Sequence, residues 1–320
     1  MIFTGILETP LKTQDATIHL NINNPTATKP SNSVKERREK TMAADLSFGP
    51  PGSQWHYTRS TRTYDLTRGR LPAITVPTTQ GAPGTNIRIA PAATALVVVD
   101  MQNFFLHPDC RDHPLGLAAV PPTLRLVEKC RALGVQANPD LQTMPAAVQR
   151  GFARALIAAA AAGDPSTTTT TTTAPAPAPS SAIGLGAQLP GSQGRVLFRG
   201  SWNAELYAPL AAAAAAAQDV VCGKNRLSGL WCADTPLWRH LTTTTTATGI
   251  KTLLFAGVNT DQCVLGTLAD AYNAGWDCVL VEDCCATASP AGAGEAVVFN
   301  AAHTYGFVTS SDAFPSAASS

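Results

Sequence analysis

The sequence predicts an α/β fold of three layers, in which helices cover both faces of a mostly parallel sheet. Two observations lead to this class. The run Ala95–Val99 is apolar on both faces and mostly β-branched, which is typical of a central strand in a parallel sheet. Over the last third of the chain, apolar runs of strand length alternate with helical segments, and such alternation predicts parallel strands with right-handed crossovers.

The individual elements follow from the same patterns. After the strand at 95–99, we expect strands at 219–223, 250–257, 278–282 and 306–309. We expect helices at 118–133, 141–162, 211–217, 235–246, 261–275 and 291–304. Gly134 and Gly275 are the stop signals of two of these helices, and the threonine run after 241 is a poor helix former.

The rest of the chain divides by composition. Residues 1–85 are rich in Thr, Asn, Ser and Pro without a sustained period, so we expect an irregular N-terminal extension. Within it, 48–68 is a candidate ordered arm, because the rings of Trp55, Tyr57 and Tyr64 are able to lie across a core. Residues 86–312 form the folded domain, and the threonine and Ala-Pro tracts within 163–194 predict a low-complexity surface insertion. Residues 313–320 are a tail.

Composition excludes several classes of function. The net charge is +1 and the only basic block is 35–40, so we expect no nucleic-acid partner. Apolar runs fall far short of the ~20 residues of a membrane helix, and no signal peptide is visible. The eight cysteines form no C-x-x-C pair and have no histidine at zinc-finger spacing. We therefore expect a cytoplasmic protein without cofactor or metal, although His107 and His113 lie beside aspartates.

The strongest chemical signal is the segment Gly257–Val264, in which a strand is followed by a tight turn and a helix start that carries Cys263. Unpaired N–H groups and the helix dipole at that position favour a thiolate and are able to hold an oxyanion. A buried structural cysteine at a helix–sheet contact remains the alternative.

Asp100 and Lys224 also follow predicted strand ends. In parallel sheets, active sites lie at the carboxyl ends of strands, so both side chains are expected near Cys263. A carboxylate there is either a general base or a local cap. A lysine beside the cysteine lowers the pKa of the thiol, and one beside Asp100 keeps that carboxylate ionised. Taken alone, Lys224 is equally consistent with a surface charge.

Three segments in this order and spacing form a specific combination: Val97–Phe104, Gly223–Ser228 and Gly257–Val264. In these segments the chain resembles the isochorismatase-like cysteine hydrolases, which include nicotinamidases and the ureidoacrylate and biuret-type amidohydrolases. The resemblance covers about residues 90–312. It implies a Rossmann-type topology and a catalytic triad of Asp100, Lys224 and Cys263.

The resemblance also implies a reaction. Asp100 takes the thiol proton, Lys224 stabilises charge, and Cys263 attacks a carbonyl carbon while N–H groups near Asn259 and Cys263 bind the oxyanion. Isochorismatases proper lack the cysteine, so the family pattern favours hydrolysis of a small amide or ureido substrate through a thioester. It places a cis peptide at Val258–Asn259 and allows a homo-oligomer.

Four further residues are candidates for the substrate pocket, each with a plainer alternative. Trp202, in a loop that resembles the family's loop near the site, is a pocket wall or simple packing. Asn103 contacts substrate or forms a turn. Arg226 contacts substrate or pairs with a surface carboxylate, and Trp231 contacts substrate or belongs to the core.

The family's second core strand is the main departure. Only Val135 and Gln136 precede Ala137-Asn-Pro139-Asp, whereas strands usually need about 5 residues and proline breaks a central strand. We therefore expect this strand to be missing or truncated, which would displace Lys224 by ~4.8 Å, one strand spacing. A catalytically impaired binding or assembly module is the competing hypothesis.

Overall fold

The computed structural model describes residues 45–140, 187–224, 226–243 and 249–315, with only the backbone of 136–140. The chain divides into two compact units, Met1–Ala43 and Ala44–Ser320, and all described residues belong to the second. The predicted helix at 141–162 and most of the predicted insertion lie outside the described residues.

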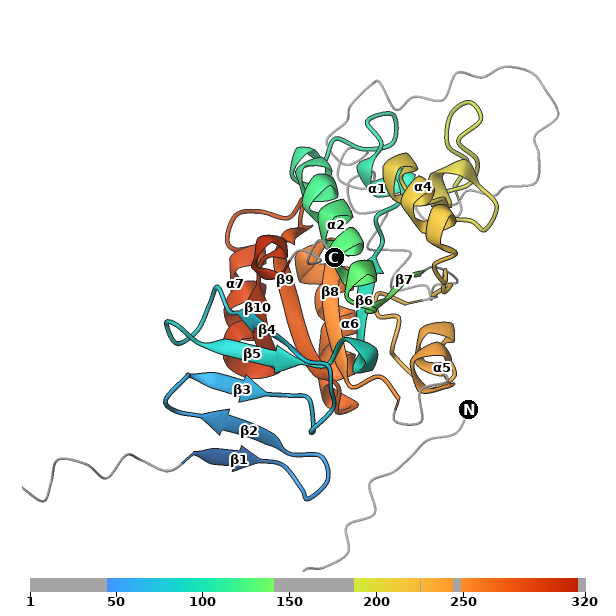
Figure 1. Ribbon diagram of the computed structural model, residues 1–320. Coiled ribbons are helices and arrows are strands. Elements are labelled where there is room, and N and C mark those ends of the chain that lie inside the picture. Colours follow the sequence, from blue (N-terminus) through green and yellow to red (C-terminus); the bar gives the residue numbers. More distant parts are fainter. Residues whose placement is uncertain (1–44, 141–186, 225, 244–248, 316–320) are drawn as a thin grey trace, which may run out of the picture. The chain divides into compact units, whose positions relative to one another are not determined.

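A parallel sheet of five strands forms the centre of this unit (Figure 1). Its strands are β6 (Thr94–Val99), β7 (Gln136–Asp140), β8 (Thr252–Val258), β9 (Asp277–Ala286) and β10 (Gly306–Thr309). They lie in the order β10-β9-β8-β6-β7, and every neighbouring pair is parallel. The predicted α/β class is confirmed.

Helices accompany this sheet at the places that the sequence predicts, with shifted ends, except that the short helix α1 was not predicted. They are α1 (Asn103–Leu106), α2 (Pro114–Ala132), α4 (Ala208–Ala217), α5 (Pro236–Thr243), α6 (Leu265–Asn273) and α7 (Ala293–Asn300). A π-helical turn, Thr260–Val264, precedes α6, and another, Ala301–Tyr305, follows α7. Among the described residues, no helix has both the length and the apolar character required to cross a membrane.

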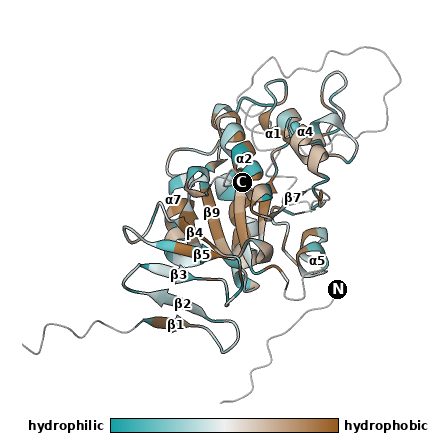
Figure 2. Cartoon of the chain, in the orientation of Figure 1, coloured by the Kyte–Doolittle hydropathy of each residue, from teal (hydrophilic) through white to brown (hydrophobic). Residues whose placement is uncertain are grey.

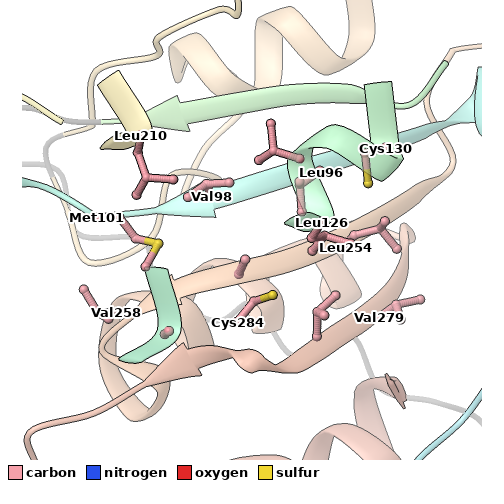
Figure 3. Close-up of a cluster of buried hydrophobic side chains, with 14 of the residues drawn as sticks. Leu96, Val98, Met101, Leu126, Cys130, Leu210, Leu254, Val258, Val279 and Cys284 are labelled. Carbon is pink, nitrogen blue, oxygen red and sulfur yellow. The ribbon is translucent and has the colours of Figure 1, made fainter. Parts of the chain in front are cut away.

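Successive residues of β6 explain why its run is apolar on both faces. Leu96 and Val98 join a core cluster that includes α2, and Figure 3 shows this cluster between the helix and the strands. Ala95 and Val97 join the opposite cluster, which includes residues of α5 and α6. Figure 2 shows the resulting hydrophobic strands at the centre, as expected for a sheet covered on both faces.

The expected loss of the second strand is wrong. β7 has five residues and pairs in register with β6 from Ala95↔Gln136 to Val99↔Asp140, with Pro139 opposite Val98. It is the last strand in the order of the described sheet. Proline is tolerated in an edge strand because the missing N–H is needed only on a side that has a neighbour.

The predicted strand at 219–223 is also corrected. Only Cys222 forms a bridge there, and the residues around it are not a strand. Val220 and Val221 are exposed, so this apolar pair is not buried as a sheet strand would be. Conversely, β9 runs to Ala286, four residues beyond the prediction, because a bulge opposite β8 lets Cys285 and Ala286 pair with Gly257 and Val258.

The prediction of an irregular segment up to residue 85 does not hold from residue 46 onward. A second sheet of five strands, in the order β1-β2-β3-β5-β4, occupies this part of the chain. Its strands are β1 (Leu46–Phe48), β2 (Trp55–Thr58), β3 (Thr63–Asp65), β4 (Ile74–Pro77) and β5 (Asn86–Ile89). Strands of three or four residues are too short to produce a recognisable period in the sequence.

Polar and aromatic contacts attach this second sheet to the parallel sheet. Arg68 forms a two-pronged ion pair with the buried Asp277, and the indole of Trp55 donates to the same carboxylate at 2.8 Å. The ring of Phe307 packs on Trp55 and Tyr64. Asp277 and Phe307 belong to β9 and β10, so the two sheets share buried structure.

Candidate active site

The ends of β6 and β8 bring Asp100 and Cys263 to one edge of the parallel sheet. Asp100 follows β6 directly, in the left-handed region at φ 51°. Cys263 lies in the π-helical turn that follows β8. Val99 pairs with Gly257, and a Cβ atom on Gly257 would lie 2.0 Å from the carbonyl oxygen of Val99. The strands approach so closely here because that residue is a glycine.

Lys224 completes the group through a buried ion pair. Its Nζ atom lies 2.7 Å from Asp100 Oδ2, and the two residues are 1% and 2% exposed. The ammonium also donates to the carbonyl oxygens of Leu227 at 3.0 Å and Arg226 at 3.3 Å. Lys224 thus lies beside Asp100. The displacement that we expected from a missing strand does not occur, and β7 is present.

Cys263 is 2% exposed, and burial is the largest cause that raises the pKa of its thiol. The negative charge of Asp100 raises this pKa further, and the positive charge of Lys224 acts in the opposite direction without cancelling the rise. Burial thus opposes the thiolate that the helix start favours, and it agrees with the expected transfer of a thiol proton to Asp100. The thiol needs a base, and no N–H or O–H group of the described residues donates to Asp100 Oδ1.

A short segment after β9 holds the turn that carries Cys263. Ala288 N donates to Asn259 Oδ1 at 3.2 Å, and Thr287 Oγ1 donates to Asp261 Oδ1 at 2.5 Å. Gln262 Nε2 donates to the hydroxyl of Ser289 at 3.4 Å. The peptide Val258–Asn259 is cis, as the resemblance implies. The sequence gives no signal for this bracing segment, because its contacts are long-range.

A second anchor joins the same helix to the loop after Lys224. Thr267 Oγ1 donates to Cys263 O at 2.8 Å and accepts from Gly229 N at 3.2 Å. The loop also carries Ser228, whose hydroxyl accepts from Leu230 N at 3.0 Å. These contacts keep the loop 226–231, called the lysine loop below, beside the turn of Cys263 and the helix α6.

The four tentative pocket residues are distributed differently. Asn103 is buried, and its Nδ2 donates to Trp202 O at 2.9 Å, so it fixes the loop of Trp202. Trp202 packs edge-on against His107, with ring centroids 4.8 Å apart. The guanidinium of Arg226 lies over the ring of Trp231 at 4.5 Å. Trp231 is 42% exposed, so the core alternative for this residue is wrong.

A cavity of about 630 Å³ adjoins Asp100. The loop 199–206, the helix α4 and the segment 218–223 line it, together with Gln102. The lining described here contains Asp100 but neither Cys263 nor Lys224. The three side chains of the predicted triad are neighbours, but of the three residues only Asp100 lines this cavity. Gln102 was not predicted as a site residue, although it belongs to the segment Val97–Phe104.

Metal and disulfide chemistry find no support in the part of the chain that the structure describes. No group of three or more His, Cys, Asp or Glu side chains suited to a metal ion occurs among these residues. His113 is buried with Nδ1 3.2 Å from Phe105 O, so it does not combine with His107. All eight cysteines are free.

Known proteins with similar sequences indicate the family of this chain. A family model of the isochorismatase domain matches residues 94–313. A ureidoacrylate amidohydrolase RutB from Methylobacterium radiotolerans is 30% identical over 237 residues, which cover 72% of this chain and 81% of that protein. The RutB of Acinetobacter baylyi is 29% identical over 231 residues, covering 71% and 84%.

Among solved structures, an N-carbamoylsarcosine amidase from Thermoplasma acidophilum has a TM-score of 0.46 and 23% sequence identity. The match covers 69% of this chain and 97% of that chain. The match to the isochorismatase domain extends over more than half of the sequence, from the first strand of the parallel sheet to beyond its last. The chain therefore belongs to the isochorismatase-like cysteine hydrolase family.

Proposed function

We propose that the chain hydrolyses a C–N bond of a small amide or ureido compound, with Cys263 as the nucleophile and a thioester as the intermediate. One observation carries the proposal. A buried ion pair between Lys224 and Asp100 lies beside a buried thiol, and Asp100 keeps one oxygen without a donor among the described residues. Burying a carboxylate, an ammonium and a thiol together costs desolvation energy and is not required for stability, so the arrangement indicates a functional site.

The proposed reaction begins with proton transfer. Since burial and Asp100 raise the pKa of the Cys263 thiol, the sulfur is protonated at rest. Asp100 takes this proton as the sulfur attacks the carbonyl carbon, and the carbonyl electron pair moves to oxygen. Backbone N–H groups of Asn259 and Cys263 stabilise the oxyanion, and Lys224 compensates the local negative charge.

The second half reverses these transfers. The oxyanion collapses, the C–N bond breaks, and protonated Asp100 gives its proton to the departing nitrogen, which leaves a thioester on Cys263. Water then attacks the thioester carbonyl and loses a proton to Asp100. The C–S bond breaks, the proton returns to sulfur, and the acid product is released.

The substrate class is supported by the relatives. Two of them, 30% and 29% identical, are named ureidoacrylate amidohydrolases. A ureido group or a simple amide is small enough for the cavity of about 630 Å³ beside Asp100. Asn103 and Trp202 act there by shaping the loop 199–206, while Arg226 and Trp231 contact each other within the loop that follows Lys224.

A second candidate function rests on the burial of the nucleophile. Cys263 is 2% exposed and does not line the cavity, as expected for a relative that survives as a binding or assembly module. The two functions differ in whether the sulfur ever becomes acylated.

The test is to trap the thioester. The full chain is mixed with a panel of small amides and ureido acids, quenched in acid, and analysed by intact and peptide mass spectrometry. We expect an acyl adduct on the peptide of Cys263 and loss of turnover in Cys263→Ser. Cys130→Ser is the matched control, because Cys130 is buried in α2 away from the site. A folded protein without adduct or turnover on the whole panel would support the binding module instead.

A further inference from the structure

Two buried acceptor oxygens beside the cavity accept from no N–H or O–H group among the described residues. They are Oδ1 of Asp100 and Oε1 of Gln102. Both residues are at most 2% exposed, and both line the cavity of about 630 Å³. A buried acceptor without a donor costs about 1–3 kcal/mol. Two of them at one cavity indicate a ligand that supplies N–H groups.

The orientation of the Gln102 amide is determined by its surroundings. Its Nε2 atom donates to the carbonyl oxygen of Ala204 at 2.5 Å. Because a carbonyl oxygen only accepts hydrogen bonds, the NH₂ end of the amide must face Ala204. The other end is therefore the oxygen, so Gln102 presents an acceptor rather than a donor.

The backbone keeps Gln102 in this place. Gln102 forms an isolated bridge with Leu206, and Asn103 N donates to Glu205 O at 3.0 Å. Tyr207 N donates to Met101 O at 3.0 Å, which closes the same short ladder. The backbone contacts thus fix the main chain at Gln102, and the hydrogen bond to Ala204 O fixes the end of its side chain.

Gln102 is also tied to the proposed base. Its N–H donates to the carbonyl oxygen of Asp100 at 2.9 Å across a tight turn. Lys224 occupies Oδ2 of Asp100, so only Oδ1 of that carboxylate remains for a ligand. The two acceptor oxygens come from residues two apart that both face the cavity.

The charged groups of the cavity do not supply the missing donors. Glu205 and Asp219 line it as acceptors, and Asp219 is itself paired with Arg131. Arg199 also lines the cavity, but no hydrogen bond from it reaches either orphan oxygen. A ligand with N–H donors complements the two acceptor oxygens.

We infer that Gln102 binds the departing nitrogen and selects substrates with a terminal –NH₂, namely primary amides or unsubstituted ureido groups. This inference rests on the hydrolase function proposed above. One hydrogen of the nitrogen bonds to Gln102 Oε1. The other side of the nitrogen faces Asp100 Oδ1, which delivers the proton taken from Cys263, so that the C–N bond breaks and ammonia leaves. An ester oxygen has no hydrogen for Gln102 and gains nothing from it.

The test compares matched substrates. A primary amide and a methyl ester with the same acyl group are assayed on the wild-type chain and on Gln102→Met, which keeps a similar length but has no amide oxygen. We expect kcat/KM for the amide to fall by about 10- to 100-fold, and that for the ester to change by less than about threefold. Gln188→Met is the matched control, since Gln188 is exposed and lies outside the cavity lining.

The ratio of amide to ester activity is measured on one protein sample, so a loss of folded protein cancels. An equal fall for both substrates would mean that Gln102 is only structural and would overturn the inference while leaving the hydrolase intact. A folded wild-type chain that cleaves neither substrate would reject the hydrolase itself, and with it this role of Gln102. A fall confined to the amide supports both.

Discussion

The two sides of the candidate site are held by different means. Asp100 and the turn of Cys263 follow β6 and β8, two central strands whose backbones approach closely at Gly257. Lys224 follows no strand, and its ammonium is placed by Asp100 and by two loop carbonyl oxygens. The sheet therefore fixes the spacing of Asp100 and Cys263, whereas the position of the Lys224 ammonium depends on its own hydrogen bonds.

The largest effect is expected from Gly257→Ala. The added Cβ would lie 2.0 Å from Val99 O, and the backbone at φ 128° is unfavourable for alanine. The two strand ends must separate, so we expect the free energy of unfolding to fall by about 4 kcal/mol or more and hydrolysis to be lost. Denaturant unfolding and the amide assay measure both.

Gly266→Ala is the control for this substitution. Gly266 lies in α6 facing the lysine loop, where the nearest atom to an added Cβ is Ser228 N at an ordinary 3.6 Å. Alanine favours helices, so stability should stay the same or rise by up to about 1 kcal/mol. If the two variants were equally stable, the sheet would not set the spacing and the comparison would fail.

A smaller effect is expected from Lys224→Met. Removing the ammonium leaves the Asp100 charge buried without its cation, which should cost about 3 kcal/mol of unfolding free energy. The double variant Asp100→Asn with Lys224→Met should recover part of this stability but no activity. Simple additivity of the two substitutions in a double-mutant cycle would contradict the buried pair.

The smallest effect is expected on the pKa of the Cys263 thiol. Asp100 raises the pKa of this thiol and Lys224 lowers it, so removing each should move the pKa in opposite directions. The pH midpoint of labelling by a small thiol reagent should fall in Asp100→Asn and rise in Lys224→Met. Midpoints are compared rather than rates, because access to the sulfur also changes. Shifts in the same direction would show that burial alone controls the sulfur.

The parallel sheet and the shared location of Asp100 and Cys263 were predictable because each depends on local patterns. Apolar runs of β6, β8 and β9 mark buried strands, and the rule that sites lie at carboxyl ends of strands selects Asp100 and Cys263. The family pattern then supplies Lys224, whose predicted strand does not exist. Lys224 lies beside Asp100 as predicted, but it does not follow a strand as the prediction assumed.

Other features were not predictable because they depend on contacts between distant residues. The short strands β1–β5 are stabilised by pairing with one another and by contacts to Asp277, about two hundred residues from Trp55 and Arg68. Pro139 argues against a strand only in the middle of a sheet, and the sequence does not show that β7 lies at the edge. The raised pKa of Cys263 results first from burial and then from Asp100, and the charge of Lys224 does not cancel this rise.

The Asp277 carboxylate has a practical consequence for any attempt to isolate the hydrolase domain. The sequence places the domain boundary at residue 86, but Arg68 and Trp55 both lie before it. A protein cut at 86 would keep the whole parallel sheet and lose the cation of a buried carboxylate, leaving only the hydroxyl of Thr252 beside it. The shortest chain worth expressing therefore begins near residue 45, ahead of β1.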